Sequence, residues 1–135
     1  MLKNLFFVLF FLLITQISYA KQEIEVLKVY DGDSILAKID DNIFRIRLYG
    51  IDCFEGAKSD RAKWQAKKYK LSVEEIINGG NIAGEILKEK LKNKKVMFDF
   101  KGIDKYSRAL GNLYIDNVSI EDEMLKTPYC FVYKK

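Results

Sequence analysis

Between residues 23 and 51, apolar and polar side chains alternate in short runs, and this pattern constrains the fold more than any other feature of the chain. The runs lie at 23–30, 34–39 and 43–49 and are separated by Asp31-Gly32 and by Asp40-Asp41-Asn42, residue types that favour tight turns. A period of two places successive side chains on opposite faces of a strand. The segment therefore predicts three strands joined as hairpins, with Arg45 and Arg47 on one face of the third strand and Phe44, Ile46 and Leu48 on the other.

Helical and strand patterns follow in the rest of the chain. Ser72-Val73-Glu74-Glu75 is a capping-box pattern that opens a short helix, which Asn78-Gly79-Gly80 is expected to end. Asn81 is expected to cap a second helix that runs to about Lys92, with a core face of Ile82, Ile86, Leu87 and Leu91. Strands are predicted near 95–100 and at 109–115, and a short helix at 119–126. We interpret residues 55–70, which are basic and have no clear period, as a long loop with at most one helical turn.

The first twenty residues have the pattern of a signal peptide. Lys3 precedes an apolar run from Leu5 to Ile14, and Ser18-Tyr19-Ala20 matches the small-x-small cleavage pattern. An uncleaved membrane anchor is the alternative, but the run is shorter than the roughly 18 residues of a spanning helix. We therefore expect one domain at 21–135, secreted or periplasmic, monomeric, and without stable membrane association after cleavage.

Composition excludes several classes of enzyme. The chain has no histidine, which rules out Ser-His-Asp hydrolases and His-ligated zinc enzymes in their usual forms. Cys53 and Cys130 can form a disulfide in an exported protein, although their spacing alone does not establish one. Loss of Lys3 with the signal peptide lowers the net charge from +4 to +3, so the chain is only mildly basic.

Acidic residues gather in two segments that a hairpin can bring together. Asp31-Gly32-Asp33-Ser34 forms the first turn, and the stretch from Arg47 to Glu55 contains Asp52. Close carboxylates repel one another and raise their own pKa values unless a cation lies between them, and a hard cation such as calcium prefers oxygen ligands. Asp-Gly-Asp alone is more typical of an ordinary turn, so the metal interpretation depends on Arg47, Asp52 and Glu55 as well.

Three blocks of sequence carry a family resemblance. Residues 31–34, 47–55 and Asp104-Lys105-Tyr106-Ser107-Arg108-Ala109-Leu110 resemble, in order, the signature blocks of the staphylococcal nuclease family. The resemblance covers about residues 23–133. It implies an α+β fold with an OB-fold, five-stranded β-barrel and packed helices, and the activity of a calcium-dependent endonuclease on DNA and RNA that leaves 3′-phosphates. The alternative is a related OB-fold module that binds nucleic acid without cutting it.

The resemblance also implies roles for individual residues. Calcium would be held by Asp33, Asp52 and the Cys53 carbonyl, with Asp31 acting through water. Glu55 would activate the attacking water, and Arg47 and Arg108 would bind the scissile phosphate. Nucleotide contacts are implied for Lys105, Tyr106, Tyr129 and Tyr133.

The chain departs from the family pattern in three places. Phe54 stands where family members usually have proline, a change expected to loosen the placement of Glu55. We also expect the domain to lack the C-terminal helix of the family. Trp64 and Tyr69 lie among lysines in the long 55–70 segment, which suits either a solvated loop or a second nucleic-acid contact.

Overall fold

A computed structural model describes residues 21–134, so the predicted signal peptide at 1–20 lies outside the described residues. In chain order the elements are β1 (Gln22–Asp31), β2 (Ser34–Ile39), β3 (Asn42–Leu48), β4 (Ile51–Cys53), α2 (Asp60–Tyr69), α3 (Val73–Leu91), β5 (Val96–Ile103), β6 (Ala109–Ile115), β7 (Val118–Ser119), α4 (Ile120–Leu125) and β8 (Cys130–Val132).

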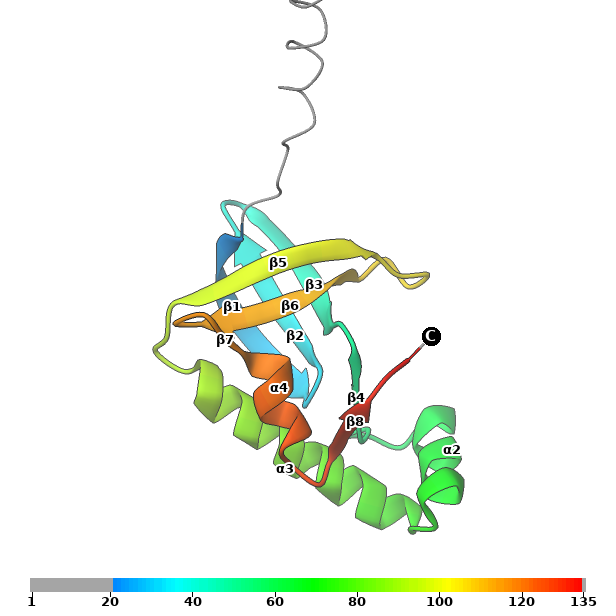
Figure 1. Cartoon of the computed structure of the whole chain (residues 1–135). Helices are drawn as coiled ribbons and strands as arrows, with labels where there is room; N and C mark the ends of the chain where they lie inside the picture. Colours follow the sequence, from blue (N-terminus) through cyan, green and yellow to red (C-terminus); the bar gives the residue numbers. More distant parts are fainter. Residues whose placement is uncertain (1–20, 135) are drawn as a thin grey trace, which may run out of the picture.

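Five strands close into a barrel. The sheet order β3-β2-β1-β5-β6-β7 is antiparallel throughout, and a parallel pairing of β3 with β6 closes the first five of these strands, with β7 outside the closure. Figure 1 shows α3 lying across one end of this barrel, with α4 between them. The predicted α+β, OB-fold barrel with packed helices is confirmed.

The alternation predicted for the hairpins determines the core. Ile35, Ile46 and Leu48 point inward with at most 1% of their surface exposed, as the period of two requires. β1 departs from the pattern, because its register with β2 shifts between Val26 and Lys28 and again between Val29 and Asp31. The second shift lies at the first acidic turn, where irregular pairing changes the direction of side chains.

The predicted break at Asn78-Gly79-Gly80 is wrong, since α3 continues from Val73 to Leu91 without interruption. The two glycines serve close packing. A Cβ at Gly79 would meet the ring of Phe54 at 2.8 Å, and a Cβ at Gly80 would overlap the backbone of Glu55. Lacking side chains, they let the helix contact the segment after β4 directly. The capping box at Ser72 and Glu75 is confirmed, whereas Ile82 is 45% exposed and does not join the core.

The segment interpreted as a long loop contains a ten-residue helix, α2, which corrects that prediction. Ser59 caps its N-terminus by accepting a hydrogen bond from the Ala62 amide, and Lys70 ends it in the left-handed conformation. Its inward residues, Ala62, Gln65 and Ala66, recur at helical spacing, but the small and polar side chains hide the apolar stripe. Ala62 and Ala66 pack with Phe54 and with Ile76 of α3 in a small second core.

A separate two-stranded ribbon joins β4 to β8 and carries a disulfide. Cys53 and Cys130 are register partners in this antiparallel pair, and their sulfur atoms are bonded. The link therefore fastens the short strand that contains Asp52 to a strand 77 residues further along the chain. None of the described helices is both long and apolar enough to cross a membrane.

Candidate active site

Two neighbouring segments place the acidic residues together at one edge of the barrel. Ser34 pairs with Arg47 in the β2–β3 ladder, and the Leu48 amide donates a 2.8 Å hydrogen bond to the Asp33 carbonyl. These contacts bring the acidic turn between β1 and β2 beside the end of β3. Because β4 follows β3 after a two-residue turn, Asp52 arrives at the same place.

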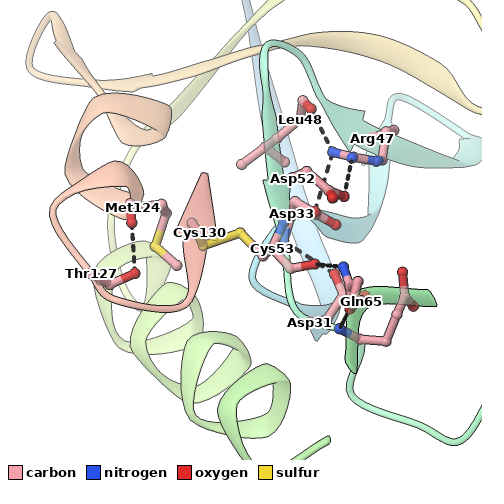
Figure 2. The surroundings of a disulfide bond; sticks show 11 residues. Asp31, Asp33, Arg47, Leu48, Asp52, Cys53, Gln65, Met124, Thr127 and Cys130 are labelled. Atoms are coloured by element: carbon pink, nitrogen blue, oxygen red, sulfur yellow. Dashed lines mark hydrogen bonds and ion pairs between the residues drawn. A yellow bond between two sulfur atoms is a disulfide. The ribbon is translucent and has the colours of Figure 1, made fainter. Parts of the chain in front are cut away.

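Arg47 connects two of the predicted metal ligands. Its guanidinium lies 3.4 Å from a carboxylate oxygen of Asp33 and 3.3 Å from one of Asp52, and it also donates to the Leu48 carbonyl at 2.8 Å. Figure 2 shows both carboxylates facing this guanidinium. Only 14% of the Arg47 side chain is exposed, so the ion pairs are poorly screened by solvent.

Asp33 is the most buried acidic group of this set. The Cys53 amide donates a 2.6 Å hydrogen bond to Asp33 Oδ2, and the Asp33 amide donates a 3.1 Å bond to Asp31 Oδ1. Burial raises the pKa of Asp33 well above its usual value, although the attraction of Arg47 opposes the change. Burial likewise raises the pKa of Asp31. The two aspartates of the turn are thus held close together and largely removed from water.

Glu55 is positioned through its backbone by a residue that sequence reasoning missed. The side chain of Gln65, 1% exposed, accepts a 2.9 Å hydrogen bond from the Glu55 amide and donates a 3.0 Å bond to the Cys53 carbonyl. Figure 2 shows Gln65 beside Cys53. With Gln65 and the Gly80 backbone on either side, the segment containing Phe54 is held in place without the family's usual proline.

Arg61 is the second residue that sequence reasoning missed. Its guanidinium lies 2.7 Å from a carboxylate oxygen of Asp52 and 3.4 Å from one of Glu55. The pKa of Glu55 is raised mainly by burial and next by repulsion from Asp33, whereas the positive charge of Arg61 opposes this change. A helical interpretation of residues 60–69 would have placed Arg61 and Gln65 one turn apart on the same helical face, but not their contacts with Glu55.

The third block of the family resemblance forms the turn between β5 and β6. Ala109 pairs with Ile46, so the backbone of this block lies beside β3. The side chain of Arg108 contacts Asp104 at 2.7 Å, within its own turn, and not the carboxylates near Arg47. Lys105 and Tyr106 are exposed at the same turn, with the lysine ammonium 5.1 Å from the centre of the tyrosine ring.

The two C-terminal tyrosines have different surroundings. Tyr129 packs against both core clusters, and its carbonyl accepts a 2.9 Å hydrogen bond from the Phe54 amide. Tyr129 is thus half-buried and packed, and its expected contact with a nucleotide stays a prediction. Tyr133 is 47% exposed, and its amide donates to the Gly50 carbonyl near the end of β3. Tyr133 thus remains available for stacking.

The acidic cluster fits a hard divalent cation in chemistry and in charge. Four carboxylates, those of Asp31, Asp33, Asp52 and Glu55, interact with only two guanidinium groups. When all are ionised, this leaves two negative charges, the charge that one dication would balance. Within residues 21–134, however, no three acidic, cysteine or histidine side chains lie at the spacing of a metal site. From this part of the chain the Cys53 carbonyl accepts one hydrogen bond, from Gln65, and its second lone pair is free to contact a cation.

Comparison with known proteins identifies the family of the chain. The family model described as staphylococcal nuclease homologue matches residues 45–135. An uncharacterized protein of Methanocaldococcus jannaschii is 30% identical over 123 residues, which cover 81% of this chain and 58% of that protein. The chain thus spans less than two thirds of that relative. On the family match, together with the closed barrel and the clustered acidic residues and arginines, this chain belongs to the staphylococcal nuclease homologue family.

Proposed function

We propose that this protein is an exported, calcium-dependent endonuclease that hydrolyses phosphodiester bonds in DNA and RNA and leaves 3′-phosphates. The observation that carries the proposal is the cluster at the barrel edge, where Arg47 contacts both Asp33 and Asp52, and Arg61 connects Asp52 to Glu55. Membership of the family supports nuclease chemistry. A protein that only binds nucleic acid has no need of partly buried carboxylates beside a phosphate, since they would repel it.

In this mechanism Glu55 accepts a proton from the water that attacks phosphorus. Its carboxylate can accept a proton, and it retains 28% side-chain exposure through which water can reach it. Asp33 and Asp52 would hold the calcium ion, with Asp31 supporting the set through its contact with Asp33. When bound, calcium supplies positive charge that stabilises the charge developing on the phosphoryl oxygens.

Two arginines would bind the scissile phosphate. Arg47 has the planar guanidinium fork that suits phosphate oxygens, and it already faces the cluster. Arg108 would have to exchange its contact with Asp104 for one with the phosphate, and its position next to the β3–β6 pairing supports this role. Lys105, Tyr106 and Tyr133 are exposed and would contact the flanking nucleotides.

Export is supported by the disulfide and by the pattern of residues 1–20. Cys53 and Cys130 are bonded, and structural disulfides are found mainly in oxidising compartments. We propose that the mature protein is secreted or periplasmic and monomeric. Mass spectrometry of the protein from an exporting host would detect cleavage after Ala20. Retention of residues 1–20 would contradict the proposal.

A cleavage assay tests the enzymatic function. Supercoiled plasmid, heat-denatured DNA and RNA are incubated with the purified protein, in calcium or in chelator. Cleavage is expected only in calcium. Glu55→Gln and Arg108→Ala are each expected to abolish cleavage while nucleotide binding survives. Wild-type rates in both variants would refute the assigned roles.

The second candidate is a module that binds nucleic acid without cutting it. One observation favours it: Arg108 is paired with Asp104 and does not contact the acidic cluster. Binding without any calcium-dependent product in the same assay would support this candidate. Cleavage that chelator abolishes would exclude it.

A further inference from the structure

The exposed side of α2 forms a continuous ridge of cationic and aromatic residues. Arg61, Trp64 and Lys68 follow one another at spacings of three and four residues, which places them on one helical face. The Arg61 guanidinium lies 5.2 Å and the Lys68 ammonium 4.8 Å from the Trp64 ring centre. Trp64 is 49% exposed. An indole held at the surface between two cations is suited to a partner that is both flat and anionic.

Charge on α2 also favours an anionic partner. Residues 60–70 contain one acidic residue, Asp60, and five basic ones, Arg61, Lys63, Lys67, Lys68 and Lys70. Lys63 is paired only with Asp60, at 3.8 Å, and Lys67, Lys68 and Lys70 form no ion pair with a described carboxylate. The mildly basic character of the chain is therefore concentrated on this helix, where a polyanion would meet it.

The ridge begins at the catalytic cluster. Arg61 contacts Asp52 and Glu55, and Gln65 fixes the helix to the Cys53 carbonyl and the Glu55 amide. Figure 1 shows α2 outside the barrel, connected to β4 and next to the β4–β8 ribbon. At about 1.5 Å per residue, the ridge runs about 10 Å from Arg61 to Lys68, which is the length of about three stacked nucleotides.

We infer that the exposed face of α2 is a subsite for single-stranded nucleic acid flanking the scissile phosphate, with Trp64 stacking on a base and Lys68 contacting the backbone. This inference rests on the proposed function and deepens it by naming a part of the substrate. A single strand is favoured because bases in a duplex are already stacked on one another and cannot cover an indole ring. A base would replace one cation on the ring, and the freed lysine would then contact phosphate.

An anionic membrane is the competing partner for a basic helix with a tryptophan. A helix that lies in a membrane interface needs an exposed apolar face. The apolar side of α2 is already used, since Ala62 and Ala66 are buried against Phe54 and Ile76. Trp64 is the one exposed apolar residue of the ridge, so the structure favours nucleic acid.

Trp64 is the only tryptophan in the chain, so its fluorescence reports on this face alone. The experiment uses the purified Glu55→Gln variant in calcium, which allows binding to be measured without cleavage. Single-stranded oligodeoxynucleotides are titrated while Trp64 emission is recorded, and the affinity of a labelled oligonucleotide is measured by anisotropy at several salt concentrations. Quenching of Trp64 is expected for single strands and not for blunt duplexes of the same length.

Substitutions on the Glu55→Gln background then locate the contact. Trp64→Ala is expected to weaken binding about tenfold, and Trp64→Phe, which keeps an aromatic ring, to retain most of it. Lys68→Ala is expected to reduce the slope of log affinity against log salt by about 0.7, the loss of one phosphate contact. Lys94→Ala is the matched control, since Lys94 is an exposed lysine in the turn after α3 and should leave the affinity within twofold. Circular dichroism checks that each variant is folded.

The outcomes separate this inference from the proposed function. Unchanged Trp64 emission at saturating oligonucleotide, or equal affinities of Trp64→Ala, Lys68→Ala and Lys94→Ala, would overturn the subsite even if the wild-type protein cuts DNA. Loss of binding in Trp64→Ala and Lys68→Ala would uphold the subsite even if no cleavage is found. A shift of Trp64 emission with anionic lipid vesicles, but not with oligonucleotide, would make the helix a membrane contact and refute the inference.

Discussion

Removal of the Cys53–Cys130 disulfide should cost much of the stability of this domain. The bond closes a loop of 77 residues. If the bond acts mainly by limiting the conformations of the unfolded chain, the loss of loop-closure entropy corresponds to about 4.5 kcal/mol at 25 °C for a loop of this length. Small domains have a total free energy of unfolding of about 5–15 kcal/mol, so the loss would be a third or more of the whole.

Urea unfolding of the oxidised and the reduced protein, followed by circular dichroism, measures this difference. Reduction should lower the free energy of unfolding by about 2–5 kcal/mol. It should also steepen the dependence of this free energy on urea concentration, since an unfolded chain without the link is less compact and exposes more surface. The control is the double variant Cys53→Ala, Cys130→Ala. Its free energy of unfolding should be low both with and without the reductant.

A loss below about 1 kcal/mol on reduction, with the same dependence on urea, would refute the reasoning. It would mean that the β4–β8 pairing is held by its backbone contacts and by Tyr129 without help from the bond. If the reasoning holds, calcium binding should weaken on reduction as well, because the Cys53 amide holds Asp33 and the Cys53 carbonyl contacts Gln65.

Three further variants test other parts of the structure. Arg61→Ala should tighten calcium binding measured by calorimetry at least fivefold, because a unit charge about 4 Å from another contributes about 1 kcal/mol even in water; an unchanged affinity would contradict the pairing with Asp52. Burial raises the pKa of Glu121 from 4.5 to about 7, so its ionisation destabilises the fold as pH rises from about 4.5 to 7. The free energy of unfolding of the wild-type protein should therefore fall by up to about 3 kcal/mol more between pH 5 and 8 than that of Glu121→Gln. The same dependence of this free energy on pH in the two proteins would count against the assignment. Gly80→Ala should displace the Glu55 backbone and abolish cleavage, whereas wild-type activity in this variant would show that α3 can move away.

The sequence alone determined the features that depend on local pattern. Alternation at 34–39 predicted β2 with its observed bounds, and Ser119 with the acidic residues after it predicted α4. The order of the three blocks predicted the family and the closed barrel. The predictions of β2 and α4 were correct because the alternation of apolar residues, the capping residues and the turn residues all act within a few positions of one another.

Local pattern also predicted the acidic cluster around Arg47. A β-hairpin brings the start of its first strand beside the end of its second strand, and this pairing does not depend on the rest of the chain. The placement of Asp33 beside Arg47 follows from the pairing of Ser34 with Arg47 in one ladder. In contrast, the pairing of Arg108 with Asp104 depends on the conformation of a turn that the pattern leaves open.

Only the tertiary structure decided the features that depend on contacts between distant segments. Gly79 and Gly80 have the composition of a helix end, yet they lie within α3 because Phe54 and Glu55 pack on them. Gln65 interrupts the apolar stripe of α2, and its burial makes sense only with Cys53 and Glu55 beside it. The sequence therefore identified the acidic residues and Arg47 at the barrel edge, while packing across the chain brought α2 to the same site and with it Arg61. The physical reason is that secondary structure follows from neighbouring residues, whereas a site is completed by whichever side chains the closed fold brings within contact distance.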